Sequence, residues 1–131
     1  MINQLFTTTI LVVCLSCSYL LNFEQFNLDV AVQRAKQENK NILLIFSVDS
    51  CEFCNILEND LKLFNLDNYV VCIFNATNNM EVAKSFGVIL FPTSFIISVE
   101  KNKEKILSTH VGYSQNKYKQ WIEENNAKSN K

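Results

Sequence analysis

The segment NKNILLIFSVDSCEFC, residues 39–54, decides the fold of this chain. Its middle part, residues 41–48, is a continuous apolar run with the length of a strand that is buried on both faces. Cys51 and Cys54 follow directly, and a helical pattern of apolar residues begins there. We therefore expect a buried strand that leads through a pair of thiols into a helix.

The spacing of Cys51 and Cys54 suits thiol–disulfide exchange. Two thiols at these positions of a helix start can close a disulfide, and the first sulfur lies near the positive end of the helix, which lowers its pKa. The resulting thiolate at Cys51 is the nucleophile, and Cys54 can then attack the mixed disulfide and release the product. A Cys-x-x-Cys pair alone is a modest signal, but its position at a strand-to-helix junction makes it a much stronger one.

The rest of the chain extends this unit into one α/β domain. Helices are expected at residues 30–38, 54–64, 80–86 and after Ser114, and strands at residues 41–48, 69–74, 93–99 and 105–111. Asp29 and Ser114 are the expected caps of the first and last helices, and Gly87 is expected to end the third. The strand–helix–strand crossover requires parallel strands, and a hairpin turned at residues 101–103 adds antiparallel ones. The prediction is a mixed sheet with helices on both faces.

The apolar spacing also marks the side chains that are expected to face the core. In the second helix they are Ile56, Leu57, Leu61 and Phe64, and in the last they are Tyr118, Trp121 and Ile122, with Glu123 and Glu124 outside. Cys72 lies inside the apolar run YVVCIF and is expected to act as a small core residue, with a third redox role as the alternative. His110 is expected to be a packed or edge residue rather than an acid–base catalyst.

The only proline of the chain, Pro92, stands directly before the third strand. A proline cannot donate a hydrogen bond to a strand ladder, so this position is unusual for it. We predict a cis peptide bond between Phe91 and Pro92, although only about 5–6% of X–Pro bonds are cis.

Together these features give the chain a resemblance to a known fold family. Residues 29–125, with the Cys51–Cys54 pair, Pro92 and Gly112 before the last helix, resemble thioredoxin-fold proteins, and most of all the bacterial periplasmic SoxW-type thioredoxin-like proteins. The resemblance implies a thioredoxin fold with a central mixed sheet of about four strands. It also implies that Cys51 attacks, that Cys54 resolves, and that Pro92 is a cis-proline beside them.

The same resemblance implies a site for substrate. Phe91 would offer its backbone to an extended substrate peptide, and Pro92 and Thr93 would belong to the same substrate-binding segment. The chain also departs from thioredoxin itself. Ile45 stands where thioredoxin has a buried Asp, Ser50 stands where it has a Trp, and Glu52-Phe53 replaces the Gly-Pro between the cysteines.

Two carboxylates flank the first cysteine and bear on its redox properties. Asp49 and Glu52 lie on either side of Cys51, and nearby negative charge disfavours a thiolate. A less stabilised thiolate makes the disulfide more reducing, so we expect a potential nearer the roughly −270 mV of thioredoxin than the strongly oxidising extreme near about −120 mV. The alternative is that both carboxylates point into solvent and have little effect. Phe53, between the cysteines, is the third expected neighbour of the site.

The first 23 residues contain no Lys, Arg, Asp or Glu, and residues 5–21 are nearly all apolar or hydroxylated. This pattern indicates a secretory signal peptide, with Ser16 and Ser18 suited to cleavage after Ser18. An uncleaved membrane anchor is the alternative, although residues 5–21 reach only about 25 Å as a helix. We expect export to the periplasm or another compartment outside the cytosol, with residues 24–131 as the thioredoxin-like domain. A cytosolic protein is the remaining alternative.

Neither metal nor nucleic acid is expected as a ligand. Cys14 and Cys17 repeat the Cys-x-x-Cys spacing within the leader, but the gap from Cys17 to Cys51 exceeds the roughly 15–20 residues typical of zinc-binding pairs. The net charge of −1 gives no basic footprint for nucleic acid, and Lys101, Lys103 and Lys105 suit a solvated hairpin. Two glycines and one proline also exclude a glycine-rich phosphate loop and a proline-rich ligand.

The leading hypothesis for these 131 residues is a monomeric thiol–disulfide oxidoreductase that acts on exported proteins. Its redox group would be the Cys51–Cys54 disulfide, without a cofactor, and its partners would be protein thiols or disulfides and an upstream redox protein. Contact with a membrane is expected only through an uncleaved N-terminal segment. One alternative is a binding or chaperone-like module that uses a groove at Pro92 without turnover. Another is a copper metallochaperone, although no Met-rich or His-rich segment accompanies the cysteines.

Overall fold

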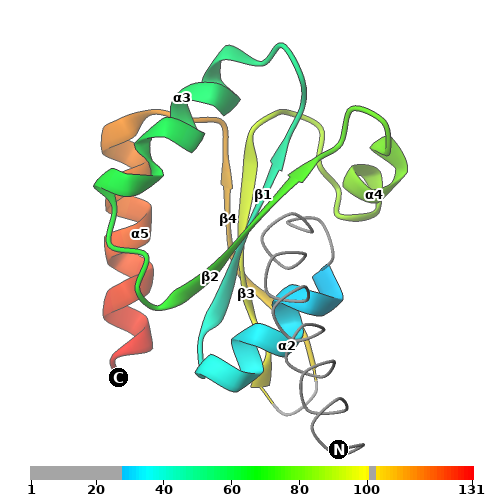
Figure 1. The fold of residues 1–131 in the computed structure, drawn as a ribbon. Helices are drawn as coiled ribbons and strands as arrows, with labels where there is room; N and C mark the ends of the chain where they lie inside the picture. The colour runs from blue at the N-terminus through cyan, green and yellow to red at the C-terminus, as the bar shows by residue number, and fades with distance from the viewer. Residues whose placement is uncertain (1–27, 101–102) are drawn as a thin grey trace, which may run out of the picture.

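The computed structural model describes residues 28–100 and 103–131, which build a four-stranded sheet with helices on both faces (Figure 1). The expected leader and the tip of the expected hairpin, residues 101–102, lie outside the described residues. The strands are β1 (Asn41–Ser47), β2 (Tyr69–Asn75), β3 (Thr93–Ser98) and β4 (Lys105–Val111). The helices are α2 (Leu28–Glu38), α3 (Glu52–Asp60), the short 3-10 helix η1 (Leu61–Leu63), α4 (Met80–Ser85) and α5 (Gln115–Ser129).

The order of the strands across the sheet is β2–β1–β3–β4. β1 pairs with β2 in parallel, and Ile45 stands opposite Ile73 in this pair. β3 runs antiparallel to both of its neighbours, β1 and β4, so the expected late hairpin is present. The predicted mixed sheet and the predicted order of helices and strands are both confirmed.

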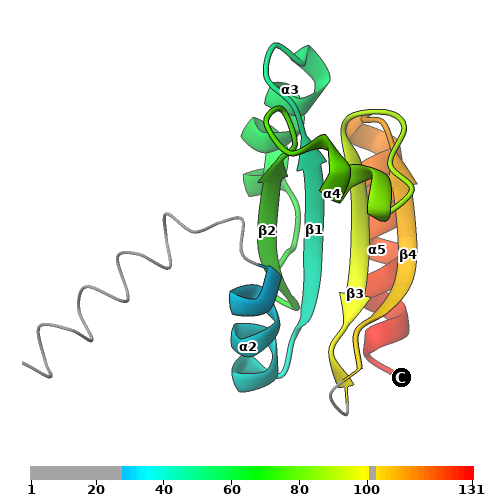
Figure 2. The ribbon, with the colours of Figure 1, turned by 90° about the vertical axis from the view of Figure 1, so that its right-hand side faces the viewer.

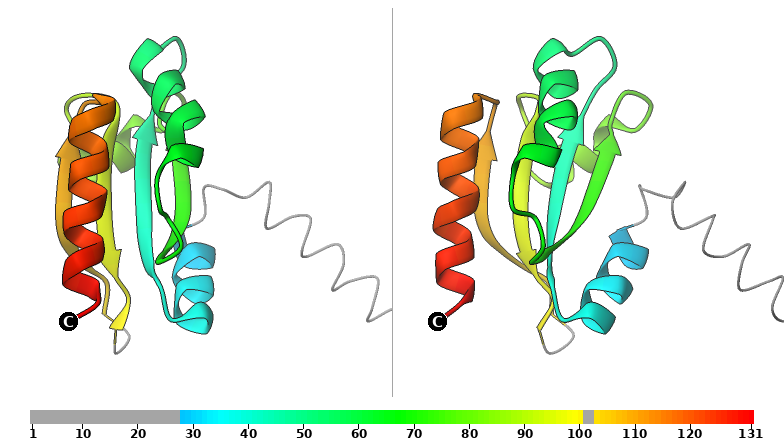
Figure 3. Two further views of the ribbon diagram at one scale, coloured as in Figure 1. Left: turned by 90° about the vertical axis from the view of Figure 1, so that its left-hand side faces the viewer. Right: turned by 60° about the vertical axis from the view of Figure 1, so that its left-hand side comes forward.

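The unbroken apolar run of β1 is explained by cores on both faces of the sheet. Successive side chains of a strand point to opposite faces. Ile42, Leu44 and Phe46 belong to the core beneath α2 and α4, whereas Leu43 and Ile45 belong to the core beneath α3 and α5. Figure 2 shows α2 and α4 in front of the first face, and Figure 3 shows α3 and α5 in front of the second.

The end of α4 confirms the role that the sequence predicts for Gly87. Gly87 has a φ of +74°, a conformation in which most other residues would be strained. Its N–H donates to the carbonyl of Lys84 at 2.9 Å, and the N–H of Val88 donates to the carbonyl of Ala83 at 3.0 Å. These two bonds satisfy the last carbonyls of the helix and turn the chain toward the loop that precedes β3.

Four details of the helices differ from the expectations. Asp29 lies within the first turn of α2 rather than before it, and Ser114 is the N-cap of α5 as expected, but its side chain makes no capping bond. The second helix ends at Asp60 and gives way to η1 instead of continuing to residue 64. Ile56 is 39% exposed because Leu57, its neighbour about 100° around the helix, takes the core-facing position.

Within the described residues, none of the helices combines the length and apolarity that crossing a membrane requires.

Candidate active site

Cys51 and Cys54 form a disulfide where the chain passes from β1 into α3. Their Cα atoms are 5.2 Å apart. Cys51 is the N-cap of α3, with an extended backbone, and its Sγ accepts a hydrogen bond from the N–H of Cys54 at 3.3 Å. An N-cap side chain compensates the unpaired N–H groups of the first helical turn. The same groups stabilise negative charge on a sulfur in this position when the disulfide is reduced.

The two cysteines differ in their access to solvent. Cys54 is only 1% exposed, on the inner side of α3, whereas Cys51 is half-buried at the surface. A sulfur of another molecule therefore reaches Cys51 and not Cys54. This difference suits the expected roles of Cys51 as the attacking thiol and Cys54 as the resolving thiol.

The loop before β3 forms the second side of the site. The Phe91–Pro92 peptide bond is cis, as predicted. The carbonyl oxygen of Phe91 lies 3.8 Å from Cys51 Sγ, and the carbonyl of Pro92 accepts a hydrogen bond from the N–H of Gly112 at 2.8 Å. Pro92 thus joins the loop to the end of β4 and holds Phe91 against the disulfide.

The three residues of the expected substrate-binding segment differ in their access to solvent. Pro92 and Thr93 are both buried, and Thr93 Oγ1 donates to the carbonyl of Leu90 at 2.6 Å. Their side chains therefore position the loop. Of the three residues, only Phe91 is partly open to the surface.

Exposed apolar side chains surround the disulfide end of the sheet. Ile89 is 87% exposed and Leu90 is 62% exposed, in the loop that precedes Phe91. Phe53, between the two cysteines, is 57% exposed. We call these three residues the apolar rim. Ile89 and Leu90 were not expected from the sequence, because the run VILF before Pro92 has the composition of a core segment.

Asp49, beside the disulfide, is fixed by hydrogen bonds to two residues that the sequence had not suggested. Asn75 Nδ2 donates to Asp49 Oδ1 at 2.7 Å, and the N–H of Asp49 donates to Thr77 Oγ1 at 2.8 Å. These bonds join the turn after β1 to the turn after β2. The signal for Asn75, the last residue of β2, was its place directly after the expected apolar strand 69–74, because the carboxyl ends of parallel strands meet at one edge of a sheet. Asp49 and Glu52 are both exposed, so the alternative of solvent-facing carboxylates agrees with their positions.

A hydroxyl pair lies in the core beside Ile45. Ile45 is fully buried and stands opposite Ser94 in the β1–β3 pair. Tyr118 OH donates to Ser94 Oγ at 2.9 Å, and burial raises the pKa of Tyr118. Hydroxyl groups therefore lie beside the position at which thioredoxin has its buried carboxylate, and the sequence did not predict this pair.

Cys72 and His110 are packed as the sequence predicts. Cys72 lies in the core beneath α2 and α4, and burial raises the pKa of its thiol to about 11. The ring of His110 contacts Tyr118 and Trp121, and its pKa is lowered first by burial and then by the charge of Lys117. In the part of the chain that the structure describes, no three His, Cys, Asp or Glu side chains gather as they would around a metal ion.

Comparison with known proteins supports the fold through solved structures. No protein-family model matches the sequence, and no curated protein sequence matches it. Thioredoxin of Trichomonas vaginalis is similar, with a TM-score of 0.60 and 23% identity over 73% of this chain and 88% of that one. Plasmodium falciparum thioredoxin has a TM-score of 0.62 and 17% identity, over 75% of this chain and 81% of that one. Poplar thioredoxin h has a TM-score of 0.62 and 18% identity, over 72% of this chain and 83% of that one. The chain therefore has the thioredoxin fold, with a disulfide between Cys51 and Cys54 at the start of α3.

Proposed function

We propose that the chain is a thiol–disulfide oxidoreductase that reduces or exchanges disulfides of exported proteins. The observation that carries this proposal is the placement of the disulfide. Cys51 caps α3 at the surface, and its partner Cys54 is buried directly beneath it. A structural disulfide has no need of one accessible sulfur at a helix N-terminus, whereas an exchange reaction depends on it.

The reaction proceeds in two exchanges from the reduced protein. The Cys51 thiolate attacks one sulfur of a substrate disulfide, forms a mixed disulfide, and expels the other substrate sulfur as a thiolate that takes a proton from water. Cys54 then loses its proton and attacks Cys51 Sγ, which breaks the mixed disulfide and releases the second substrate thiol. The substrate gains two electrons and the protein becomes the Cys51–Cys54 disulfide. An upstream dithiol protein must reduce it for another cycle.

The surroundings of Cys51 suit a peptide substrate in an extended conformation. The carbonyl of Phe91 lies beside Cys51 Sγ, and a peptide that paired with this backbone would bring its own sulfur toward Cys51. The apolar rim of Phe53, Ile89 and Leu90 would contact the residues on either side of the substrate cysteine. These contacts would favour substrate segments with apolar side chains.

The proposed site of action outside the cytosol rests on the sequence. Residues 5–21 form an uncharged apolar stretch that suits a signal peptide or an anchor, and the resemblance to SoxW-type periplasmic proteins agrees with it. In an oxidising compartment the proposed substrates, proteins with disulfides, are abundant.

Trapping of the mixed disulfide tests this proposal. In a Cys54→Ala variant the second exchange cannot occur, so substrate proteins should remain bound to Cys51 and be released by dithiothreitol. The matched control carries Cys51→Ala as well and should capture nothing. A binding module without turnover would instead hold its ligands equally in both variants, in complexes that dithiothreitol does not dissolve.

A further inference from the structure

The end of the sheet opposite the disulfide carries an open cavity of about 1020 Å³. It lies where β1 and β4 begin and where α2, β3 and α5 end. Its charged lining residues are five lysines and a single glutamate, namely Lys36, Lys40, Lys105, Lys128, Lys131 and Glu100. We call the five lysines the lysine pole.

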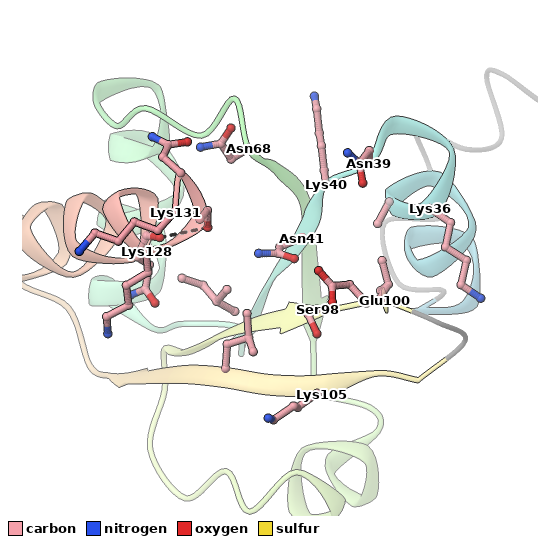
Figure 4. Close-up of a pocket in the computed structure, with 17 residues that line it drawn as sticks. Lys36, Asn39, Lys40, Asn41, Asn68, Ser98, Glu100, Lys105, Lys128 and Lys131 are labelled. Atoms are coloured by element: carbon pink, nitrogen blue, oxygen red, sulfur yellow. Dashed lines mark hydrogen bonds between the residues drawn. The ribbon is translucent and has the colours of Figure 1, made fainter.

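The lysine side chains spread around the cavity instead of meeting inside it. Figure 4 shows Lys36 and Lys40 on one side of the opening and Lys128 and Lys131 on the other, with their ammonium groups directed outward. Asn41 and Ser98 lie between these two groups. A small anion is held by donors that converge on one point. Diverging ammonium groups match an extended surface of negative charges.

Charge is also divided between the two ends of the molecule. The chain as a whole has a net charge of −1, yet the lining of this cavity has five lysines against one glutamate, Glu100, a net charge of +4. At the other end, the exposed carboxylates of Asp49 and Glu52 flank Cys51. The seven residues of β1 separate the two ends by about 20 Å. A negatively charged surface would therefore attract one end of the protein and leave the disulfide end free.

We propose that the lysine pole docks on the anionic phosphate headgroups of a membrane and holds the disulfide away from it. Lysines near an anionic bilayer strengthen binding about fivefold each. The sequence adds an independent observation for the alternative in which the leader is not cleaved, because the uncharged apolar residues 5–21 would then provide a second membrane signal. One apolar segment together with a basic patch is a combination that gives stable attachment to membranes.

Vesicle binding by the full chain tests the proposal. The probes are vesicles of phosphatidylcholine alone and vesicles with about 30% phosphatidylglycerol, so that binding through the apolar segment is common to both. The bound fraction should be much larger on the anionic vesicles and should fall with added salt. Lys105→Gln/Lys128→Gln/Lys131→Gln should lower the anionic preference by about 100-fold.

The matched control removes three exposed lysines elsewhere, as Lys62→Gln/Lys84→Gln/Lys117→Gln, and should keep most of the preference for anionic vesicles. Equal binding to the two vesicle types would overturn the proposal, as would an equal loss in the two variants. Inorganic pyrophosphate at constant ionic strength distinguishes the sources of phosphate. Release of the protein by micromolar pyrophosphate would show a site for a small soluble anion and would also overturn the proposal.

Discussion

Cys51 Sγ lies 3.8 Å from the carbonyl oxygen of Phe91, although the two residues are 40 positions apart in the chain. Cys51 follows the C-terminal end of β1, and Phe91 precedes the N-terminal end of β3. Because β1 and β3 are antiparallel neighbours, these two ends lie at the same edge of the sheet. The pairing of the strands therefore places the sulfur of Cys51 beside the backbone of Phe91, at which the proposed peptide substrate would bind.

The apolar rim should determine how well protein substrates bind. Replacement of both exposed aliphatic residues, Ile89→Ser/Leu90→Ser, should raise the KM for a protein disulfide about 30-fold, since each side chain loses about 1 kcal/mol of apolar contact. The rate with a small aromatic disulfide that needs no peptide contact should stay within about twofold. Steady-state kinetics with both substrates measure this split.

A control for this variant removes two other exposed apolar side chains, far from the disulfide, as Leu63→Ser/Ile106→Ser. Its KM for the protein disulfide should be that of the unmodified chain. A similar rise in both variants would assign the effect to general surface polarity rather than to contact at the rim.

The charge of Asp49, whose side chain is exposed, should make the disulfide only slightly more reducing. Asp49→Asn removes a negative charge near Cys51, which stabilises the thiolate and should raise the reduction potential by about 10–20 mV. Asp67→Asn, an exposed carboxylate before β2, is the control and should leave the potential unchanged. Equilibration with glutathione buffers gives both values. A potential above about −150 mV for the unmodified chain would contradict the expected reducing character.

The hydroxyl pair of Tyr118 and Ser94 should contribute to stability. Tyr118→Phe leaves Ser94 Oγ buried without its partner and should lower the free energy of unfolding by about 1–3 kcal/mol. Adding Ser94→Ala removes the unsatisfied hydroxyl and should recover part of that loss. Urea denaturation of the four proteins of this double-mutant cycle gives the coupling energy, and strictly additive losses would show that the pair does not interact.

Burial of Cys72 should make stability depend on pH in the alkaline range. Its pKa is about 11 in the folded protein and near 9 when unfolded, so the folded state holds the proton more tightly. This contribution is fully present below pH 9 and should be lost, by about 2–3 kcal/mol, as the pH rises to 11. The measurement compares the free energy of unfolding at pH 8 to 11 with and without Cys72→Ala. Both proteins carry Cys51→Ser/Cys54→Ser to prevent disulfide exchange, and parallel curves would contradict the prediction.

The parts of the fold that were predictable depend on local patterns. The apolar run of β1 indicated burial on both faces, Gly87 marked a helix end that needs a positive φ, and the position of Pro92 indicated the cis bond. The cysteine spacing likewise identified the disulfide. Each of these signals lies within a few residues of the feature that it predicts.

What could not be predicted depends on contacts between distant segments. The side of α3 that faces the core is set by packing against the sheet, so Ile56, which was expected to face the core together with Leu57, is exposed. The exposure of Ile89 and Leu90 depends on how the loop before Pro92 is tied to Gly112, and their composition alone suggests a core. The bond between Asn75 and Asp49 and the gathering of the lysine pole could not be predicted either, because each depends on how the fold brings distant segments together.

The most direct test of the central proposal is the rate at which the chain catalyses reduction of insulin disulfides by dithiothreitol. The unmodified chain should accelerate the reaction well above the rate with dithiothreitol alone, because the half-buried Cys51 sulfur at the surface attacks and the buried Cys54 resolves. Cys51→Ser should return the rate to that of dithiothreitol alone, whereas Cys72→Ser should retain the acceleration. An unmodified chain that gives no acceleration, or a Cys51→Ser variant that keeps it, would contradict the proposed exchange at Cys51.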